Sequence, residues 1–234
     1  MEAILDQLKA CSQHFDQTGQ VHPDTHRLLR EYEQSVADRE LGTILEIMKT
    51  QLDLQELSNK IKAIKTFCVG DGCGLKTGTY VDDLVTAFFK TQLAASYSEH
   101  HRGEADMKIC NVPLSLKTCT NPTGTQFALN WSKNKTQGDE SKNFETHIMI
   151  IVSENGHWWK RDEPVKAGIY LVDRFYCKDN IVLSSNNKTD KLITKRDVYK
   201  MVTSAKHFLE LPDPNESIRF CILDAFQPKV FSPV

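Results

Sequence analysis

Glu104-Ala105-Asp106-Met107-Lys108-Ile109-Cys110-Asn111-Val112-Pro113-Leu114-Ser115-Leu116-Lys117-Thr118 is the stretch that decides the fold. Its apolar residues alternate with polar ones, which is the period of a β-strand. Asn111-Val112 is the natural turn, so the stretch predicts a short β-hairpin. With that turn, Asp106 lies opposite Lys117 and Lys108 lies opposite Ser115.

The predicted hairpin brings an acid and a lysine together. Asp106, Ser115 and Lys117 should share one face, because side chains alternate along a strand and opposed residues point the same way. A carboxylate can hold a hard divalent cation, and a neighbouring lysine can orient or activate the attacking water. The pair therefore suits metal-assisted cleavage of a phosphodiester.

The spacing of these residues resembles a known nuclease motif. Asp106, followed by Ser115-Leu116-Lys117, is similar to the PD-(D/E)xK motif of type II restriction endonucleases, in its Ser-x-Lys variant. The resemblance implies that Asp106 and the main-chain carbonyl of Leu116 ligate Mg²⁺. It also implies that Lys117 is the water-activating base or its electrostatic partner.

Two positions depart from the motif of that family. Ala105 stands where the family has Pro, and Ser115 stands where the family has its second acid. The missing metal carboxylate must then come from elsewhere in the chain. The candidates are Glu104, Glu140 and Glu145, and the sequence does not choose among them.

A plainer interpretation of the acid–lysine pair exists. Asp opposite Lys on an exposed hairpin is commonly a surface salt bridge worth well under ~1 kcal/mol. In that case the chain is a non-catalytic binding or scaffold protein built from helices and a sheet.

The composition is that of an ordinary globular protein. The chain has 234 residues, of which 40% are hydrophobic and 26% charged, and its formal net charge is −2. This charge argues against a passive coat protein for nucleic acids. It does not argue against a nuclease, which needs only a local basic cleft beside acidic metal ligands.

The cysteines and the N-terminus predict a cytoplasmic protein. The seven cysteines are odd in number and irregular in spacing, which favours reduced thiols over a disulfide framework. No secretory signal or long apolar run is evident, so no membrane association is expected.

The chain divides by pattern into two regions. Residues 1–66 predict helices, with a long apolar pattern of 3.6-residue period from Leu41 to Ile64, and they form a helical region that packs on a core or makes a dimer interface. Residues 67–234 form the nuclease-like core. It opens with a glycine-rich loop at 67–79 and a helix at 80–96, for which Thr79-x-x-Asp82 supplies a capping-box start.

The remainder of the core predicts strands and one more helix. Apolar runs predict strands at 148–152, 169–172 and 218–226, and Thr194 caps a helix that runs to about Leu209. The expected fold class is α/β: a mixed sheet of four or five strands flanked by helices, with an N-terminal helical region. The order of elements resembles the restriction-endonuclease core, in which a helix precedes the acidic strand.

A polar segment follows directly from the lysine-bearing strand. Asn and Gln can pair bidentately with adenine, and Lys can reach guanine or phosphate. The predicted DNA contacts are Asn121, Thr123, Gln126, Asn130, Ser132, Lys133, Asn134 and Lys135. An ordinary solvated loop is the alternative for this segment, and a second polar run, 184–191 with Lys195 and Arg196, is another candidate.

Two further groups lie near the hairpin in sequence. His100 and His101 precede the acidic strand and could ligate metal or contact phosphate, although loop histidines are more often inert. Asp82 and Asp83 could face the site and hold a hydrated metal, but the capping box explains Asp82 more simply.

These observations together predict a Mg²⁺-dependent type II restriction endonuclease that hydrolyses double-stranded DNA. One chain offers one site, so cutting both strands calls for a homodimer. The alternatives are a repair or recombination nuclease of the same fold, and the non-catalytic scaffold protein. Cleavage of plasmid DNA with and without Mg²⁺ distinguishes the classes.

Overall fold

The computed structural model describes residues 1–70, 77–99, 105–119, 127–129, 146–158, 164–181 and 191–215. The chain forms two compact units, Met1–Thr43 and Ile44–Val234. Each is described by itself. None of the helices in these ranges is both long enough and apolar enough to cross a membrane.

The first unit is helical, as the sequence predicts. Helix α1 spans Glu2–Thr18, and α2 (Thr25–Gln51) begins in this unit and continues into the next. Gly19 ends α1 because its φ of 69° lies in the left-handed region, which glycine adopts without a steric penalty, and its N–H donates to the carbonyl of Phe15 at 2.7 Å.

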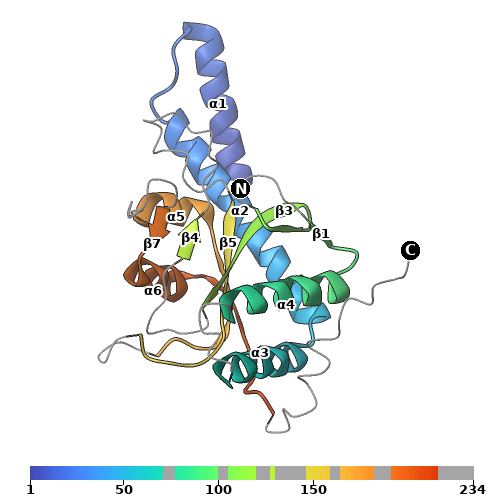
Figure 1. The fold of residues 1–234 in the computed structure, drawn as a ribbon. Coiled ribbons are helices and arrows are strands. Elements are labelled where there is room, and N and C mark those ends of the chain that lie inside the picture. The colour runs from blue at the N-terminus through green and yellow to red at the C-terminus, as the bar shows by residue number, and fades with distance from the viewer. Residues whose placement is uncertain are drawn as a thin grey trace, which may run out of the picture. The chain divides into compact units, whose positions relative to one another are not determined.

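Two more helices open the second unit. They are α3 (Leu54–Gly70) and α4 (Thr77–Gln92), which lie side by side (Figure 1). The apolar pattern from Leu41 to Ile64 is therefore shared by two helices. It is interrupted at Asp53, whose carboxylate accepts a hydrogen bond from the N–H of Glu56 at 2.9 Å and so starts α3.

The glycine-rich segment differs from its prediction at both ends. A loop was expected over 67–79, but α3 continues to Gly70 and α4 already begins at Thr77. Thr79 and Asp82 both lie inside α4, so the predicted capping box at 79–82 is wrong.

In the part of this unit that the structure describes, a mixed sheet of six strands forms the centre, where four or five strands were expected. Its strand order is β1-β2-β3-β5-β6-β8. The bounds are β1 Tyr97–Glu99, β2 Met107–Ile109, β3 Val112–Cys119, β5 His147–Val152, β6 Gly168–Val172 and β8 His207–Glu210. Strands β3 and β5 pair in parallel, and every other neighbouring pair is antiparallel.

The predicted hairpin is β2–β3, but its turn lies one residue earlier than expected. Cys110 and Asn111 have φ values of 52° and 66°, which is the pattern of a type I′ turn. Ile109 therefore pairs with Val112 and Lys108 with Pro113. The expected pairing of Lys108 with Ser115 is wrong, and so is that of Asp106 with Lys117.

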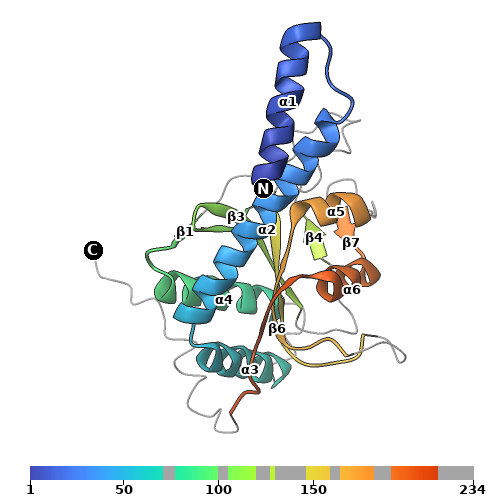
Figure 2. The same ribbon diagram turned by 180° about the vertical axis from the view of Figure 1, so that it is seen from behind.

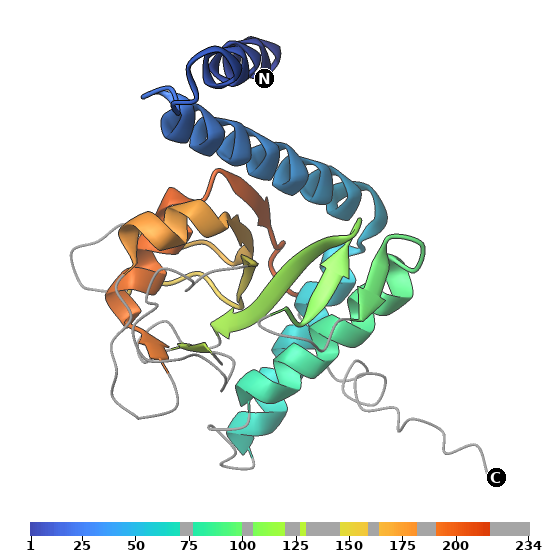
Figure 3. The same cartoon turned by 90° about the horizontal axis from the view of Figure 1, so that it is seen from above.

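Helices cover both faces of the sheet. In Figures 1 and 3, α4 lies along one face over β1 and β3, while α5 (Arg174–Asn180) and α6 (Lys195–Ser204) lie on the other. Strand β5 is buried along its whole length, as an unbroken apolar run predicts. On the α5–α6 side the core includes Ile150, Met201 and Trp158.

The second half of the chain contains elements that the sequence did not reveal. A two-stranded ribbon joins β4 (Phe127–Leu129) to β7 (Lys191–Ile193). The helix capped by Thr194 ends at Ser204 instead of near Leu209, because 207–210 pairs with β6 as β8. The strand predicted at 218–226 lies outside the described residues.

The segment after β8 is bonded to α3. Figure 2 shows this red segment running past α3. The hydroxyl of Ser58 donates to the carbonyl of Pro212 at 2.6 Å, and the Gln55 side chain donates to the carbonyl of Asp213 at 3.0 Å. These bonds satisfy backbone groups that have no strand partner.

The turn position can be tested at Cys110. Since Asn adopts positive φ more readily than Cys, Cys110→Asn is expected to raise the free energy of unfolding by about 0.5–1 kcal/mol, and Cys110→Val to lower it by about 1 kcal/mol. Urea unfolding measures both. If Val instead stabilised the protein, Cys110 would be a strand residue and the turn would lie at Asn111-Val112.

Candidate active site

The candidate site begins where β2 ends beside the longer β3. Among the described residues, the last backbone bond on this side of β3 runs from the N–H of Asp106 to the carbonyl of Leu114 at 2.9 Å. The N–H of Leu116 bonds instead to Oδ2 of the Asp106 carboxylate at 2.7 Å, and the hydroxyl of Ser115 donates to the same oxygen at 3.2 Å. The carboxylate thus takes the place of a backbone acceptor.

Lys117 completes the predicted trio. Its Nζ lies 3.9 Å from Oδ2 of Asp106, at the outer limit of an ion pair. The Lys117 side chain is only 20% exposed, whereas that of Asp106 is 49% exposed. The sequence prediction that Asp106, Ser115 and Lys117 lie together is confirmed, although the register that led to it is wrong.

Asp82 of α4 joins this cluster from the other direction. Burial raises the pKa of its carboxyl to about 6, while a hydrogen bond from Thr118 and the charge of Lys117 lower the pKa and the charges of Asp106 and Asp83 raise it. Asp82 therefore lies against Thr118, the residue that follows Lys117 on β3. It is the acid that the sequence interpretation assigned to a cap.

The Asp82 carboxylate is incompletely satisfied. Its Oδ1 is buried and has no hydrogen-bond partner among the described residues. An ionised carboxylate in that position gains from a cation beside it, because burial otherwise favours the neutral form. A carboxylate with an unpaired buried oxygen is a ligand that fits a hard divalent cation.

The main chain can supply a third oxygen. In an extended strand the N–H and C=O of one residue point toward the same neighbouring strand. The N–H of Leu116 points to Asp106. The Leu116 carbonyl therefore points to the side of Asp106 too, away from β5.

Several predicted site residues lie outside the described residues. They are Glu104, Glu140 and Glu145, the histidines at 100 and 101, and all eight DNA-contact candidates from Asn121 to Lys135. Of the second polar run, Lys195 and Arg196 are described and stand at the start of α6. Among the described residues, no group of three or more His, Cys, Asp or Glu side chains is arranged to hold a metal.

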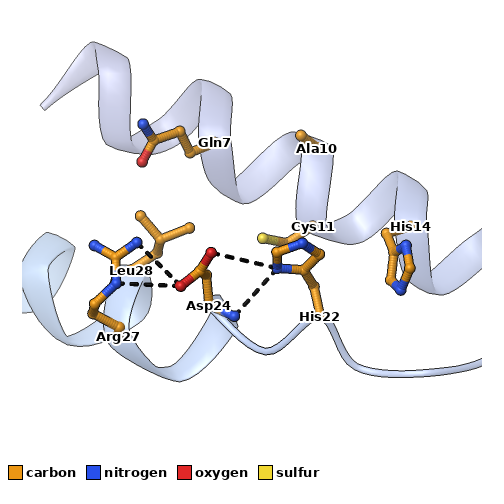
Figure 4. A pocket seen from close by; sticks show the side chains of 8 residues that line it. All are labelled: Gln7, Ala10, Cys11, His14, His22, Asp24, Arg27 and Leu28. Carbon is orange, nitrogen blue, oxygen red and sulfur yellow. Dashed lines mark hydrogen bonds and ion pairs between the residues drawn. The ribbon is translucent and has the colours of Figure 1, made fainter.

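A separate cavity of about 400 Å³ lies in the helical unit, between α1 and the start of α2 (Figure 4). Its polar residues bond to one another: Arg27 forms an ion pair with Asp24 at 3.3 Å, and the N–H of Asp24 donates to Nδ1 of His22 at 3.2 Å. Cys11 is a buried free thiol in its wall, and Cys110 and Cys177 are free thiols as well, as the sequence predicts.

Comparison with known proteins gives one distant similarity. No protein-family model and no curated protein matches the sequence. Among solved structures, the chain is similar to a restriction endonuclease in complex with substrate DNA, with a TM-score of 0.43 and 12% sequence identity over 64% of this chain and 77% of that chain. Similarity at this level does not assign the chain to a family.

The raised pKa of Asp82 predicts how stability changes with pH. Between about pH 4 and pH 6 the folded protein binds this proton more tightly than the unfolded chain, so the free energy of unfolding falls as pH rises through that range. Asp82→Asn removes the ionisable group, so this fall in the free energy of unfolding does not occur in the variant. The variant should exceed wild type by on the order of 1–3 kcal/mol at pH 7 and by much less below pH 4.

The matched control for this prediction is Asp83→Asn, because Asp83 is the exposed neighbour of Asp82 on α4. It should change the stability far less than Asp82→Asn at pH 7, because Asp83 is the smallest of the influences that raise the pKa of Asp82. Urea unfolding at both pH values gives the comparison. If Asp82→Asn changed the free energy of unfolding by the same amount at pH 7 and below pH 4, Asp82 would not be a buried acid.

Proposed function

We propose that this chain is a Mg²⁺-dependent endonuclease that hydrolyses phosphodiester bonds of double-stranded DNA. The observation that supports it most directly is the Asp106 carboxylate, which accepts from the N–H of Leu116 and lies 3.9 Å from the mostly buried Lys117. A surface salt bridge does not explain this arrangement well, because the Lys117 side chain is only 20% exposed and a second acid, Asp82, bonds to Thr118, the next residue of β3.

In this proposal the chain's own oxygens hold the cation. Asp106 offers the carboxylate oxygen that β3 does not bind, Asp82 offers its unpaired Oδ1, and Leu116 offers its carbonyl. Asp82 takes the role for which Glu104, Glu140 and Glu145 were the sequence candidates. A bound Mg²⁺ supplies charge stabilisation at the scissile phosphate and acidifies the attacking water.

Lys117 acts on the water and the phosphate. Its ammonium lies close to the Asp106 carboxylate on a rigid strand, so its position is fixed before substrate arrives. From there it can hold the attacking water in line and offset the negative charge that develops on the phosphate.

The finer parts of the proposal follow from the restriction-enzyme resemblance of the sequence motif. They are type II activity with a defined recognition sequence, a homodimer in which each copy cuts one strand, and a cytoplasmic location. The segment from Asn121 to Lys135 is proposed to read bases. A repair nuclease with this site would instead cut without a defined short sequence, and plasmid digestion into discrete fragments distinguishes the two.

Lys117→Ala should slow DNA cleavage by roughly 10²- to 10⁴-fold, because it removes a group that acts in the transition state. DNA binding and thermal stability should change little. The matched control is Lys108→Ala, a half-buried lysine on the facing strand of the same hairpin. Equal rates for wild type and Lys117→Ala in a plasmid assay would remove Lys117 from the mechanism.

Asp106→Asn and Asp82→Asn should each abolish Mg²⁺-dependent cleavage, since each removes one anionic ligand of the cation. Binding of duplex DNA in Ca²⁺ should persist in both, as measured by gel shift. Asp83→Asn, one position further along α4, should cleave as wild type. If Asp82→Asn cleaved normally while Asp106→Asn did not, the second carboxylate would come from another residue.

A further inference from the structure

Basic side chains gather on the two helices that cover one face of the sheet, α5 and α6 (Figure 1). Both helices pack on the same core, and the hydroxyl of Tyr176 on α5 donates to the carbonyl of Lys200 on α6 at 3.3 Å. Lys178, Arg196 and Lys200 are exposed, and Asp179 is the exposed acid of these helices. Because the whole chain has a formal net charge of −2, this excess of positive charge is a local feature.

On α5 two cations share one aromatic ring. The guanidinium carbon of Arg174 lies 4.9 Å from the centre of the Phe175 ring, and Nζ of Lys178 lies 5.8 Å from it. Arg174 and Lys178 are four positions apart and so are neighbours on the helix surface. Attraction to the ring offsets part of their mutual repulsion. The ring therefore keeps two positive charges close together.

On α6 the acid is withdrawn from the surface that carries the cations. Asp197 is buried, and its carboxylate accepts from the hydroxyl of Thr194 at 2.7 Å and from Nζ of Lys200 at 3.2 Å. Asp173 is likewise the N-cap of α5. Arg196 and Lys200, four positions apart, are both exposed. We call Arg174, Lys178, Arg196 and Lys200 the basic surface.

The basic surface belongs to helices on the same face of the sheet as the lysine of the candidate site. Lys117 of β3 is paired with Ile150 of β5, and Cys119 is paired with Val152. Side chains of paired residues in neighbouring strands point to the same face. Cys119, Ile150 and Val152 all belong to the core beneath α5 and α6. The Lys117 side chain therefore points to the face that these helices cover.

We propose that the basic surface binds the phosphate backbone of duplex DNA. This inference rests on the proposed function, which supplies the substrate, and it names a part of the protein that holds that substrate. Lys and Arg side chains that neutralise phosphates release counterions, and the resulting affinity does not depend on base sequence. Such contacts fix the register and orientation of a duplex without reading it. A duplex bound here lies on the face toward which Lys117 points.

The test is binding of a short fluorescent duplex of mixed sequence to the full-length protein, followed by anisotropy in Ca²⁺ over a salt series. Lys178→Ala and Arg196→Ala should each lower the slope of log affinity against log salt by about one. The double variant should lower it by about two and bind roughly 10-fold or more weakly at about 0.1 M salt. Thermal unfolding should match wild type, because both side chains are exposed.

Two controls separate charge from other effects of substitution. Arg196→Lys keeps the positive charge and should retain the wild-type salt slope. Lys62→Ala removes an exposed lysine of α3, a helix that packs beside α4, and should bind the duplex as wild type. An equal loss in Lys62→Ala would mean that DNA is attracted by the whole protein, and the assignment to α5 and α6 would be overturned.

The outcomes distinguish this inference from the proposed function. If the folded double variant had wild-type affinity and salt slope while wild type cleaved plasmid, the basic surface would be overturned and the proposed function would stand. If the double variant lost duplex binding but wild type cleaved nothing in Mg²⁺, the surface would stand and the nuclease proposal would fail. Tighter binding of wild type to phosphatidylserine vesicles than to the duplex at equal salt would overturn DNA as the partner.

Discussion

The hydrogen bond between the Asp106 carboxylate and the N–H of Leu116 is the interaction on which the site depends. Strand β2 is much shorter than β3, so the chain must satisfy a backbone donor of β3 where β2 departs. A carboxylate does this with a charge-assisted bond, and the same bond fixes the carboxylate on a rigid strand. The geometry of the hairpin thereby determines where a metal ligand can stand.

The buried acid on α4 is the counterpart of that bond. Burial removes water from the Asp82 carboxylate and so destabilises its ionised form. The positive charge of Lys117 offsets only part of this effect. A protein selected for stability alone would gain by replacing Asp82 with a neutral residue. An acid with a raised pKa whose charge interacts with those of Asp106 and Lys117 is the pattern expected where perturbed acids serve chemistry.

Much of the framework could be predicted from the sequence, and the exceptions have identifiable causes. The long apolar run of β5 and the helical N-terminal region have strong periodic signals. The turn was misplaced because Cys110 is a poor residue for positive φ, whereas Asn111 is a good one. Moving a turn by one residue changes each partner by two positions, so Asp106, Ser115 and Lys117 still share a face.

The missed elements depend on tertiary structure. Strands β1, β4 and β7 are three residues each, too short for a periodic pattern to show. The segment 207–210 fits a helical pattern equally well and becomes a strand only because β6 offers a partner. Asp82 was considered for the site and set aside for a local explanation, and no local signal reveals that α4 lies against β3.

The bonds of Asp106 within the hairpin join residues 9 and 10 positions apart, whereas the contact of Thr118 with Gly78 joins residues 40 apart. Loop closure makes non-local contacts slow, and contacts between near neighbours in sequence form earlier. The hairpin can therefore form, with the Asp106 carboxylate already bonded to β3, before α4 or β5 joins that strand. Any ligand that required both Asp106 and Asp82 would then bind only after the late contacts had formed, and so would slow unfolding more than it would speed folding.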